Sequence, residues 1–168
     1  GKDPGANIKD AIEKDITLEI GMIAQEILEN AGYKVAMTRI DDTFVELKER
    51  AGFANRKKSQ VFVSIHCNSS EDGSGKGIET YYTEQKGISS ESFANEIQNA
   101  VIEHTNADNR EVKTANYTVL VRTNMPTALV EVGFLTNSSE RELLQTEEYQ
   151  EKLAEGIAKG ILNYLQQQ

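Results

Sequence analysis

The chain has 168 residues, of which 18 are Lys or Arg and 27 are Asp or Glu, so its formal net charge is −9; 38% of its residues are apolar. A chain of this length buries roughly 70% of the surface that it exposes when unfolded, which is enough for one domain without a disulfide or structural metal. The acidic balance argues against a nucleic-acid partner, since phosphate binding depends on clustered cations. Apolar runs fall short of the ~18 residues of a membrane-spanning helix. We therefore expect a single domain over residues 1–168, with no nucleic-acid partner and no membrane insertion.

The first half of the chain alternates between helical and strand patterns. After an irregular start over Gly1–Ile12, apolar spacing predicts helices over Ile16–Ala31 and Phe44–Ala54. Strand patterns predict a strand over Tyr33–Met37 and a buried, β-branched strand over Val61–Ile65. Gly32 is expected to close the first helix, and Asp42 or Thr43 to cap the second.

The second half continues the alternation. The same signals predict strands over Ile78–Thr83, Tyr117–Val121 and Ala128–Val132. They predict helices over Phe93–His104, over a short segment that begins at Asn137, and over Tyr149–Leu165. Ser69–Gly77 is predicted to be a loop and Asn106–Asn116 a polar connection. Such alternation is typical of α/β folds, whose sites collect at the carboxyl ends of the strands.

Glu131 is the strongest single indication of chemistry, because it is a carboxylate inside the apolar run Ala128–Phe134. Strand alternation places Glu131 on the face opposite Ala128 and Val130. Partial desolvation would raise its pKa toward the range of a general acid or base. The alternative is a buried salt bridge to Arg39 or Arg122.

Two further residues are candidate metal ligands. Glu13 lies one helical turn before Ile16, on the face turned to the core, where a carboxylate needs a cation, a metal or a backbone amide as partner. A glutamate favoured by the helix dipole is the alternative. His66 ends a buried strand and precedes a glycine-rich loop, so it is either a metal ligand or a hydrogen-bonded strand-end histidine. Asn68 faces the same side if the strand continues, which makes it a candidate substrate contact.

Short motifs carrying these residues occur in an order that closely resembles the zinc-dependent N-acetylmuramoyl-L-alanine amidases (amidase type 3). The resemblance spans nearly the whole chain and rests on Asp3-Pro4-Gly5-Ala6, Glu13-Lys14-Asp15, Met37-Thr38-Arg39, Phe62-Val63-Ser64-Ile65-His66, Glu79-Thr80-Tyr81-Tyr82, Met125-Pro126 and Leu129 through Asn137. It implies a three-layer α/β/α fold with a central, mostly parallel sheet and helices on both faces. It also implies cleavage of the amide between the lactyl group of N-acetylmuramic acid and the L-alanine of the peptide stem.

Carried over position by position, the resemblance assigns Glu13 and His66 as ligands of one Zn²⁺ ion and Glu131 as the catalytic glutamate. The family's other ligand is a histidine immediately before the segment that corresponds to Lys2-Asp3-Pro4-Gly5, and His104 has no matching role. We therefore expect an N-terminally truncated catalytic domain that lacks its first strand and first zinc-ligand histidine. Zinc with an open coordination position lowers the pKa of bound water to about 7, which suits amide hydrolysis.

Two other functions fit the residues. A catalytically silent peptidoglycan-binding domain would explain the missing histidine, whereas the three retained site residues oppose it. A zinc carboxypeptidase acting on stem peptides would need cations for the terminal carboxylate, and Arg110, Lys113 and Arg122 are candidates. The resemblance further implies a peptidoglycan substrate and a site of action outside the cytoplasm, in the cell wall or spore envelope. An activator protein or a wall-binding domain outside this chain is a possible partner.

Overall fold

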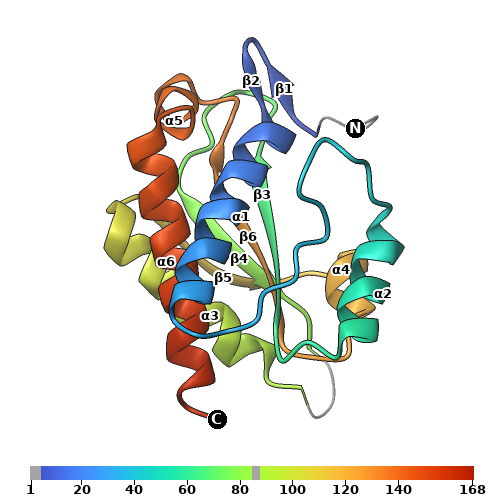
Figure 1. Cartoon of the computed structure of the whole chain (residues 1–168). Helices are drawn as coiled ribbons and strands as arrows, with labels where there is room; N and C mark the ends of the chain where they lie inside the picture. Colours follow the sequence, from blue (N-terminus) through green and yellow to red (C-terminus); the bar gives the residue numbers. More distant parts are fainter. Residues whose placement is uncertain (1–4, 85–87) are drawn as a thin grey trace.

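The computed structural model describes residues 5–84 and 88–168. A four-stranded sheet in the order β3-β6-β4-β5 lies at its centre (Figure 1). The strands are β3 (Phe62–Asn68), β4 (Ile78–Tyr82), β5 (Asn109–Thr114) and β6 (Thr127–Phe134). β3 runs parallel to β6 and β5 parallel to β4, whereas β4 and β6 are antiparallel. A small hairpin of β1 (Asn7–Ile8) and β2 (Ala11–Ile12) precedes the first helix.

Three long helices cover one face of the sheet: α1 (Glu13–Asn30), α3 (Ser90–Thr105) and α6 (Glu147–Leu165). Alternate residues of β6, namely Ala128, Val130 and Val132, point into the core between this face and the helices and are fully buried. α3 and α6 pack so closely that a Cβ atom at Gly160 would lie 2.5 Å from the Cα atom of Ile97. The small residue lets the helices approach, which fixes their position over the sheet.

The other face is covered only in part. α4 (Thr118–Val121) packs through Val119 and Leu120 against Leu129 of β6, and α2 (Leu47–Lys57) contacts α4. Glu131, two residues further along β6, points to the same face as Leu129. The sheet therefore presents polar side chains beyond the region that α4 covers. α5 (Ser138–Leu144) begins beside the end of β6, and the Asn137 side chain caps it by accepting from the backbone amides of Ser139 and Glu140.

The predicted α/β class with a central sheet flanked by helices is confirmed, although the sheet is mixed. Four segments differ from the sequence prediction. The Gly1–Ile12 start, which was expected to be irregular, contains the paired strands β1 and β2 in its described part. Tyr33–Met37 forms no strand, because no described strand pairs with it. The Asn106–Asn116 connection contains the edge strand β5, and Tyr117–Val121 contains the helix α4 rather than a strand.

The second helix begins at Leu47, after an N-cap at Glu46, so neither Asp42 nor Thr43 caps it. The Asp41 side chain instead accepts from the Thr43 amide in a local turn. The remaining predicted helices and strands are present, with ends that differ by a few residues.

A groove of about 1280 Å³ runs along the outer edge of β3. The Tyr33–Met37 segment lines it opposite Val61–Ile65, and Glu13 and His66 also contribute to its wall. Among the described residues, β3 has a strand partner only on its β6 side. Within the same residues, no helix combines the length and apolar character needed to cross a membrane.

Candidate active site

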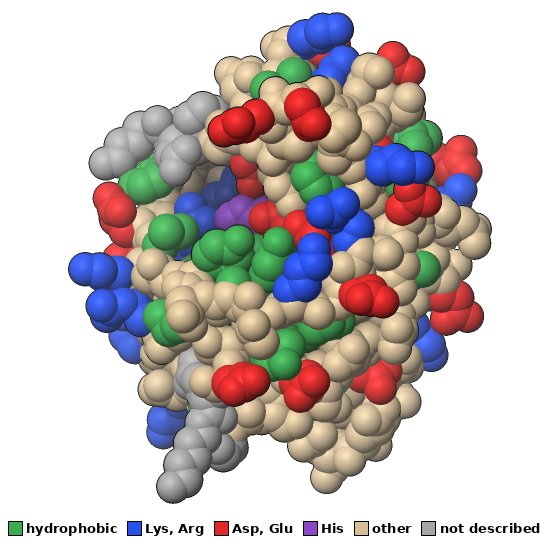
Figure 2. Space-filling model, turned by 180° about the vertical axis from the view of Figure 1, so that it is seen from behind, with side chains coloured by type: hydrophobic (Ala, Val, Ile, Leu, Met, Phe, Trp, Pro, Cys, Tyr) green, Lys and Arg blue, Asp and Glu red, His purple; other side chains and the backbone are tan. Residues whose placement is uncertain are grey.

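Three ionisable side chains form a row across the centre of the sheet. Glu131 of β6 is the register partner of His66 on β3 and of Glu79 on β4. Residues in register on neighbouring strands point to the same face and lie about 5 Å apart. The row therefore lies on the partly covered face, and the space-filling view from this side shows a histidine in a hollow beside acidic and basic side chains (Figure 2).

Glu13 reaches this row from the first residue of α1. One of its carboxylate oxygens, Oε1, lies 2.9 Å from Nδ1 of His66 and accepts from the Cys67 amide at 3.3 Å. The other, Oε2, accepts from the Ala6 amide at 2.8 Å. A Cβ atom at Gly5 would lie 2.1 Å from that oxygen, and the φ of Gly5 is +69°, so the approaching chain requires glycine here.

The electrostatics of Glu13 follow from these contacts. Burial by itself raises the pKa of the Glu13 carboxyl, but the hydrogen bonds from His66 and the two backbone amides outweigh it, and the pKa is lowered. The other imidazole nitrogen of His66, Nε2, lies 3.0 Å from the Ser64 hydroxyl. The structure thus brings the two predicted ligands into direct contact, with the carboxylate ionised.

Glu131 has the opposite environment. Its Oε2 atom is buried and has no hydrogen-bond partner within residues 5–84 and 88–168. Desolvation raises the pKa of Glu131 to about 7, with the charges of Glu13 and Glu79 adding to the rise and that of His66 opposing it. The salt bridge considered from the sequence is absent from the described residues: the Arg39 guanidinium donates to the Lys14 and Asp41 carbonyls, and Arg122 is exposed.

Asn68 lies on the same side as His66, past an irregularity in the β3–β6 register. Its side-chain amide donates to Glu79 Oε1 at 2.8 Å, and its carbonyl oxygen accepts from the Ser69 amide at 2.8 Å. These contacts fix the side chain at the end of β3. A role in binding substrate stays a prediction.

Sequence reasoning did not single out Glu79, which the structure places beside Glu131. Its side chain is 3% exposed and accepts hydrogen bonds from Asn68, Tyr81, Arg110 and Lys113. The available signal was the one used for Glu131, a carboxylate within a β-rich run. For Glu79 that run is Ile78-Glu79-Thr80-Tyr81-Tyr82.

The residues of this site fit a zinc ion in part. A carboxylate oxygen and an imidazole nitrogen that converge within 2.9 Å are donors of the kinds that zinc takes in proteins. Within residues 5–84 and 88–168, however, no cluster of three or more His, Cys, Asp or Glu side chains has the arrangement of a metal site. Two candidate ligands therefore lie together, and Glu131, whose buried Oε2 atom has no hydrogen-bond partner among the described residues, lies beside them.

The family described as N-acetylmuramoyl-L-alanine amidase (Amidase_3) matches residues 1–163. The chain belongs to this family. It is 35% identical to the sporulation-specific N-acetylmuramoyl-L-alanine amidase of Bacillus subtilis over 96% of its own length, and it spans 63% of that relative. The chain therefore spans less than two thirds of the length of that relative.

Solved structures agree with the family assignment. The catalytic domain of CwlV, an N-acetylmuramoyl-L-alanine amidase from Bacillus (Paenibacillus) polymyxa var. colistinus, superposes with a TM-score of 0.94 at 38% identity, covering 99% of this chain and 93% of that one. The CwlD amidase of Clostridioides difficile, solved in complex with the GerS lipoprotein, gives 0.94 at 35% identity, covering 100% and 94%. The resemblance predicted from the sequence is confirmed, and so is the predicted enzyme class, N-acetylmuramoyl-L-alanine amidase.

Proposed function

We propose that residues 1–168 form a single amidase catalytic domain that hydrolyses the amide between the lactyl group of N-acetylmuramic acid and the L-alanine of the peptide stem. The observation that carries the proposal is the buried, unpaired Glu131 oxygen beside the Glu13–His66 pair. Burying an unpaired polar oxygen costs free energy, so such a group is a candidate for a functional role.

In this proposal Glu13 and His66 hold one Zn²⁺ ion, which when bound supplies Lewis acidity to the attacking water and the scissile carbonyl. The hydrogen bonds from the Ala6 and Cys67 amides keep the Glu13 carboxylate ionised and oriented. Glu13 and His66 are the two donors that the described residues supply, and the family resemblance implies a histidine as the further ligand.

Glu131 acts as the general base and then as the general acid. Its carboxylate takes a proton from the water that attacks the carbonyl carbon, and it returns a proton to the nitrogen of the departing L-alanine. Its buried Oε2 atom is shielded from bulk water, which strengthens the interaction of that oxygen with the developing charges. Asn68, fixed by Glu79, is positioned to contact the substrate at the end of β3.

Replacement of Glu131 by Gln tests the role of the base. In the protein loaded with zinc, we expect Glu131→Gln to lower kcat by about 10²–10⁴-fold, since this is the usual contribution of a positioned acid or base. Zinc content, measured by elemental analysis, should stay unchanged. The control is Glu155→Gln, which removes an exposed carboxylate from α6 and should keep full activity. Equal turnover of the wild type and Glu131→Gln would refute the assignment.

Product analysis separates this proposal from its alternatives. An amidase releases a peptide with a free L-alanine amino group and leaves the lactyl carboxylate on the sugar. A carboxypeptidase, favoured by the cations Arg110 and Lys113 near the row, would release the last amino acid of the stem. A silent binding domain would bind peptidoglycan and release neither product, so mass spectrometry of digested muropeptides distinguishes the three.

We also propose that the protein acts on peptidoglycan outside the cytoplasm, in the cell wall or the spore envelope. The relative named as sporulation-specific supports this location. An activator protein is proposed as a partner by analogy with the solved amidase that is bound to a lipoprotein. Fractionation of the producing cells, followed by identification of the protein that co-purifies, would test both.

A further inference from the structure

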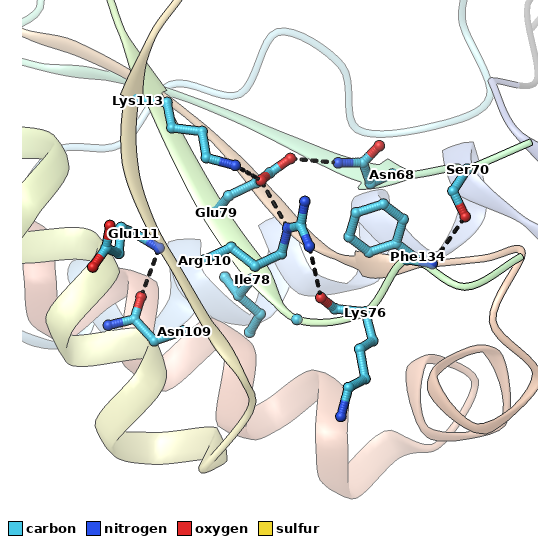
Figure 3. A network of polar contacts seen from close by, with 12 residues as sticks. Asn68, Ser70, Lys76, Ile78, Glu79, Asn109, Arg110, Glu111, Lys113 and Phe134 are labelled. Carbon is cyan, nitrogen blue, oxygen red and sulfur yellow. Dashed lines mark hydrogen bonds and ion pairs between the residues drawn. The ribbon is translucent and has the colours of Figure 1, made fainter.

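Beside the candidate active site, Glu79 gathers donors from three strands (Figure 3). Arg110 Nε of β5 donates to its Oε2 atom at 2.9 Å, and the Lys113 ammonium donates to the same oxygen. Asn68 of β3 and the Tyr81 hydroxyl of β4 donate to its Oε1 atom at 2.8 and 2.9 Å. Both carboxylate oxygens are therefore engaged, and the cations meet on a single oxygen.

The two positive charges of Arg110 and Lys113 exceed the single negative charge of the Glu79 carboxylate that lies between them. Glu79 is 3% exposed, whereas the side chains of Arg110 and Lys113 are 38% and 39% exposed. A guanidinium carries five N–H donors and an ammonium three, so several donors remain after the bonds to Glu79. The cluster presents a net positive charge to solvent in a chain whose overall charge is −9.

Arg110 is held in one orientation by more than its ion pair. Its guanidinium lies over the Phe134 ring, 5.0 Å from the ring centroid, and Nη1 donates to the Lys76 carbonyl at 3.4 Å. Three contacts on different elements reduce the freedom of this long side chain. A cation that is fixed before binding loses less entropy when it takes an anionic ligand.

The cationic pair lies within reach of the scissile bond proposed above. Glu79 is the register partner of Glu131, and β5 is the next strand beyond β4. Adjacent strands are about 4.8 Å apart, and both cations reach back from β5 to the Glu79 carboxylate on β4, so their charged groups lie roughly 5–10 Å from Glu131. An extended peptide covers that span in about two or three residues.

We infer that Arg110 and Lys113 form a subsite for a carboxylate of the peptide stem, a few residues beyond the scissile amide. This inference rests on the proposed amidase function and deepens it by identifying part of the recognised substrate. The planar guanidinium suits bidentate binding of a carboxylate, and the ammonium adds a second charge. Glu79 holds both cations at the rim of the site and leaves their outward donors available.

Two synthetic muramoyl tripeptides test the subsite. They differ only in whether the γ-linked D-glutamate, the second residue of the stem, carries a free α-carboxylate or an amide. We expect the wild type to show a KM about tenfold lower for the free carboxylate. The double variant Arg110→Gln, Lys113→Met should lose this preference through KM, with kcat changed less than twofold. Lys152→Met, which removes an exposed cation from α6, is the matched control and should keep the preference.

The single variant Lys113→Met guards against misfolding of the double variant and should lose part of the preference. Equal KM values of the wild type for the two peptides, or a preference that survives in the double variant, would overturn the inference while leaving the amidase function intact. Cleavage of neither peptide would count against the amidase function instead. In that case, calorimetric binding of both peptides decides the subsite: tighter binding of the free carboxylate supports it, and equal binding overturns it.

Discussion

Glu79 and Glu131 are register partners on β4 and β6, and each holds a carboxylate oxygen out of contact with solvent, yet their hydrogen-bond partners differ completely. Glu79 accepts hydrogen bonds from Asn68, Tyr81, Arg110 and Lys113, whereas Glu131 Oε2 has no partner in the part of the chain that the structure describes. Burial alone would raise the pKa of either group. The bonds from Lys113, Arg110 and Tyr81 reverse this for Glu79 and lower its pKa, while that of Glu131 rises to about 7.

The comparison shows that the hydrogen-bond partners decide whether desolvation is outweighed, and so whether the pKa of the carboxylate is lowered or raised. A carboxylate with charged donors on both oxygens is held in one protonation state and one orientation. A carboxylate that lacks them retains a proton affinity in the range useful for catalysis, at a cost in free energy. The side-by-side arrangement makes Glu79 an internal reference for Glu131.

The largest effect on stability is expected when the Glu79 carboxylate is removed. Glu79→Ala leaves Arg110 and Lys113 without their shared carboxylate, and we expect the free energy of unfolding to fall by about 2 kcal/mol. This is below the ~3–5 kcal/mol typical of a fully buried pair, because both cations are partly exposed to solvent. Urea unfolding measures the loss, and Glu155→Ala provides the control. A difference below about 0.5 kcal/mol would show that the network does not stabilise the fold.

Replacement of Glu131 should change the free energy of unfolding in the opposite direction. In metal-free protein, Glu131→Gln should raise the free energy of unfolding at pH 8, because the amide removes the cost of an ionised buried carboxylate. The pKa of Glu131 is higher in the folded state than its ordinary 4.5, so this cost is absent below pH 4.5, grows as the pH rises from 4.5 to about 7, and is complete above that value. The gain cannot exceed about 3 kcal/mol, and we expect about 1 kcal/mol.

The measurement is urea unfolding of both proteins at pH 5 and pH 8 in the presence of a chelator. We expect a gain at pH 8 that largely disappears at pH 5. If the substitution destabilised the protein equally at both pH values, the carboxylate would have an important partner in solution, and the contrast with Glu79 would be wrong.

The sequence predicted the elements whose faces are buried by regular packing. Helices α1, α3 and α6 follow apolar spacing, and β3 and β6 are β-branched runs covered on one face by those helices. The edge strand β5 was missed because its residues are mostly polar and half exposed, so no apolar alternation marks it. The β-branched run before Arg122 forms α4 because packing of Val119 and Leu120 against Leu129 overrides local propensity.

The candidate site was predictable where strand alternation and helix spacing determine direction. Helix spacing places Glu13 on the core side of α1, and strand alternation places Glu131 on the face of β6 opposite Val130. His66 follows from its position near the end of β3. Glu79 was not recognised because its importance lies in contacts from β5, an element that was itself missed. A site built from tertiary pairing cannot be completed until every strand in the sheet has been identified.

The smallest expected effect is the acid dependence of Glu79. Its pKa is lowered in the folded state, so its contribution to stability is fully present above the unfolded value of about 4.5 and is lost as the pH falls through the folded value. The difference in unfolding free energy between the wild type and Glu79→Gln should therefore be about 1 kcal/mol at pH 7 and should shrink between pH 4.5 and pH 3. Since Glu131 is protonated over this acid range in both proteins, its titration cancels in the difference. If the difference in unfolding free energy stayed constant down to pH 3, the charge of Glu79 would contribute nothing to stability. Only the geometry of its hydrogen bonds would then distinguish Glu79 from Glu131.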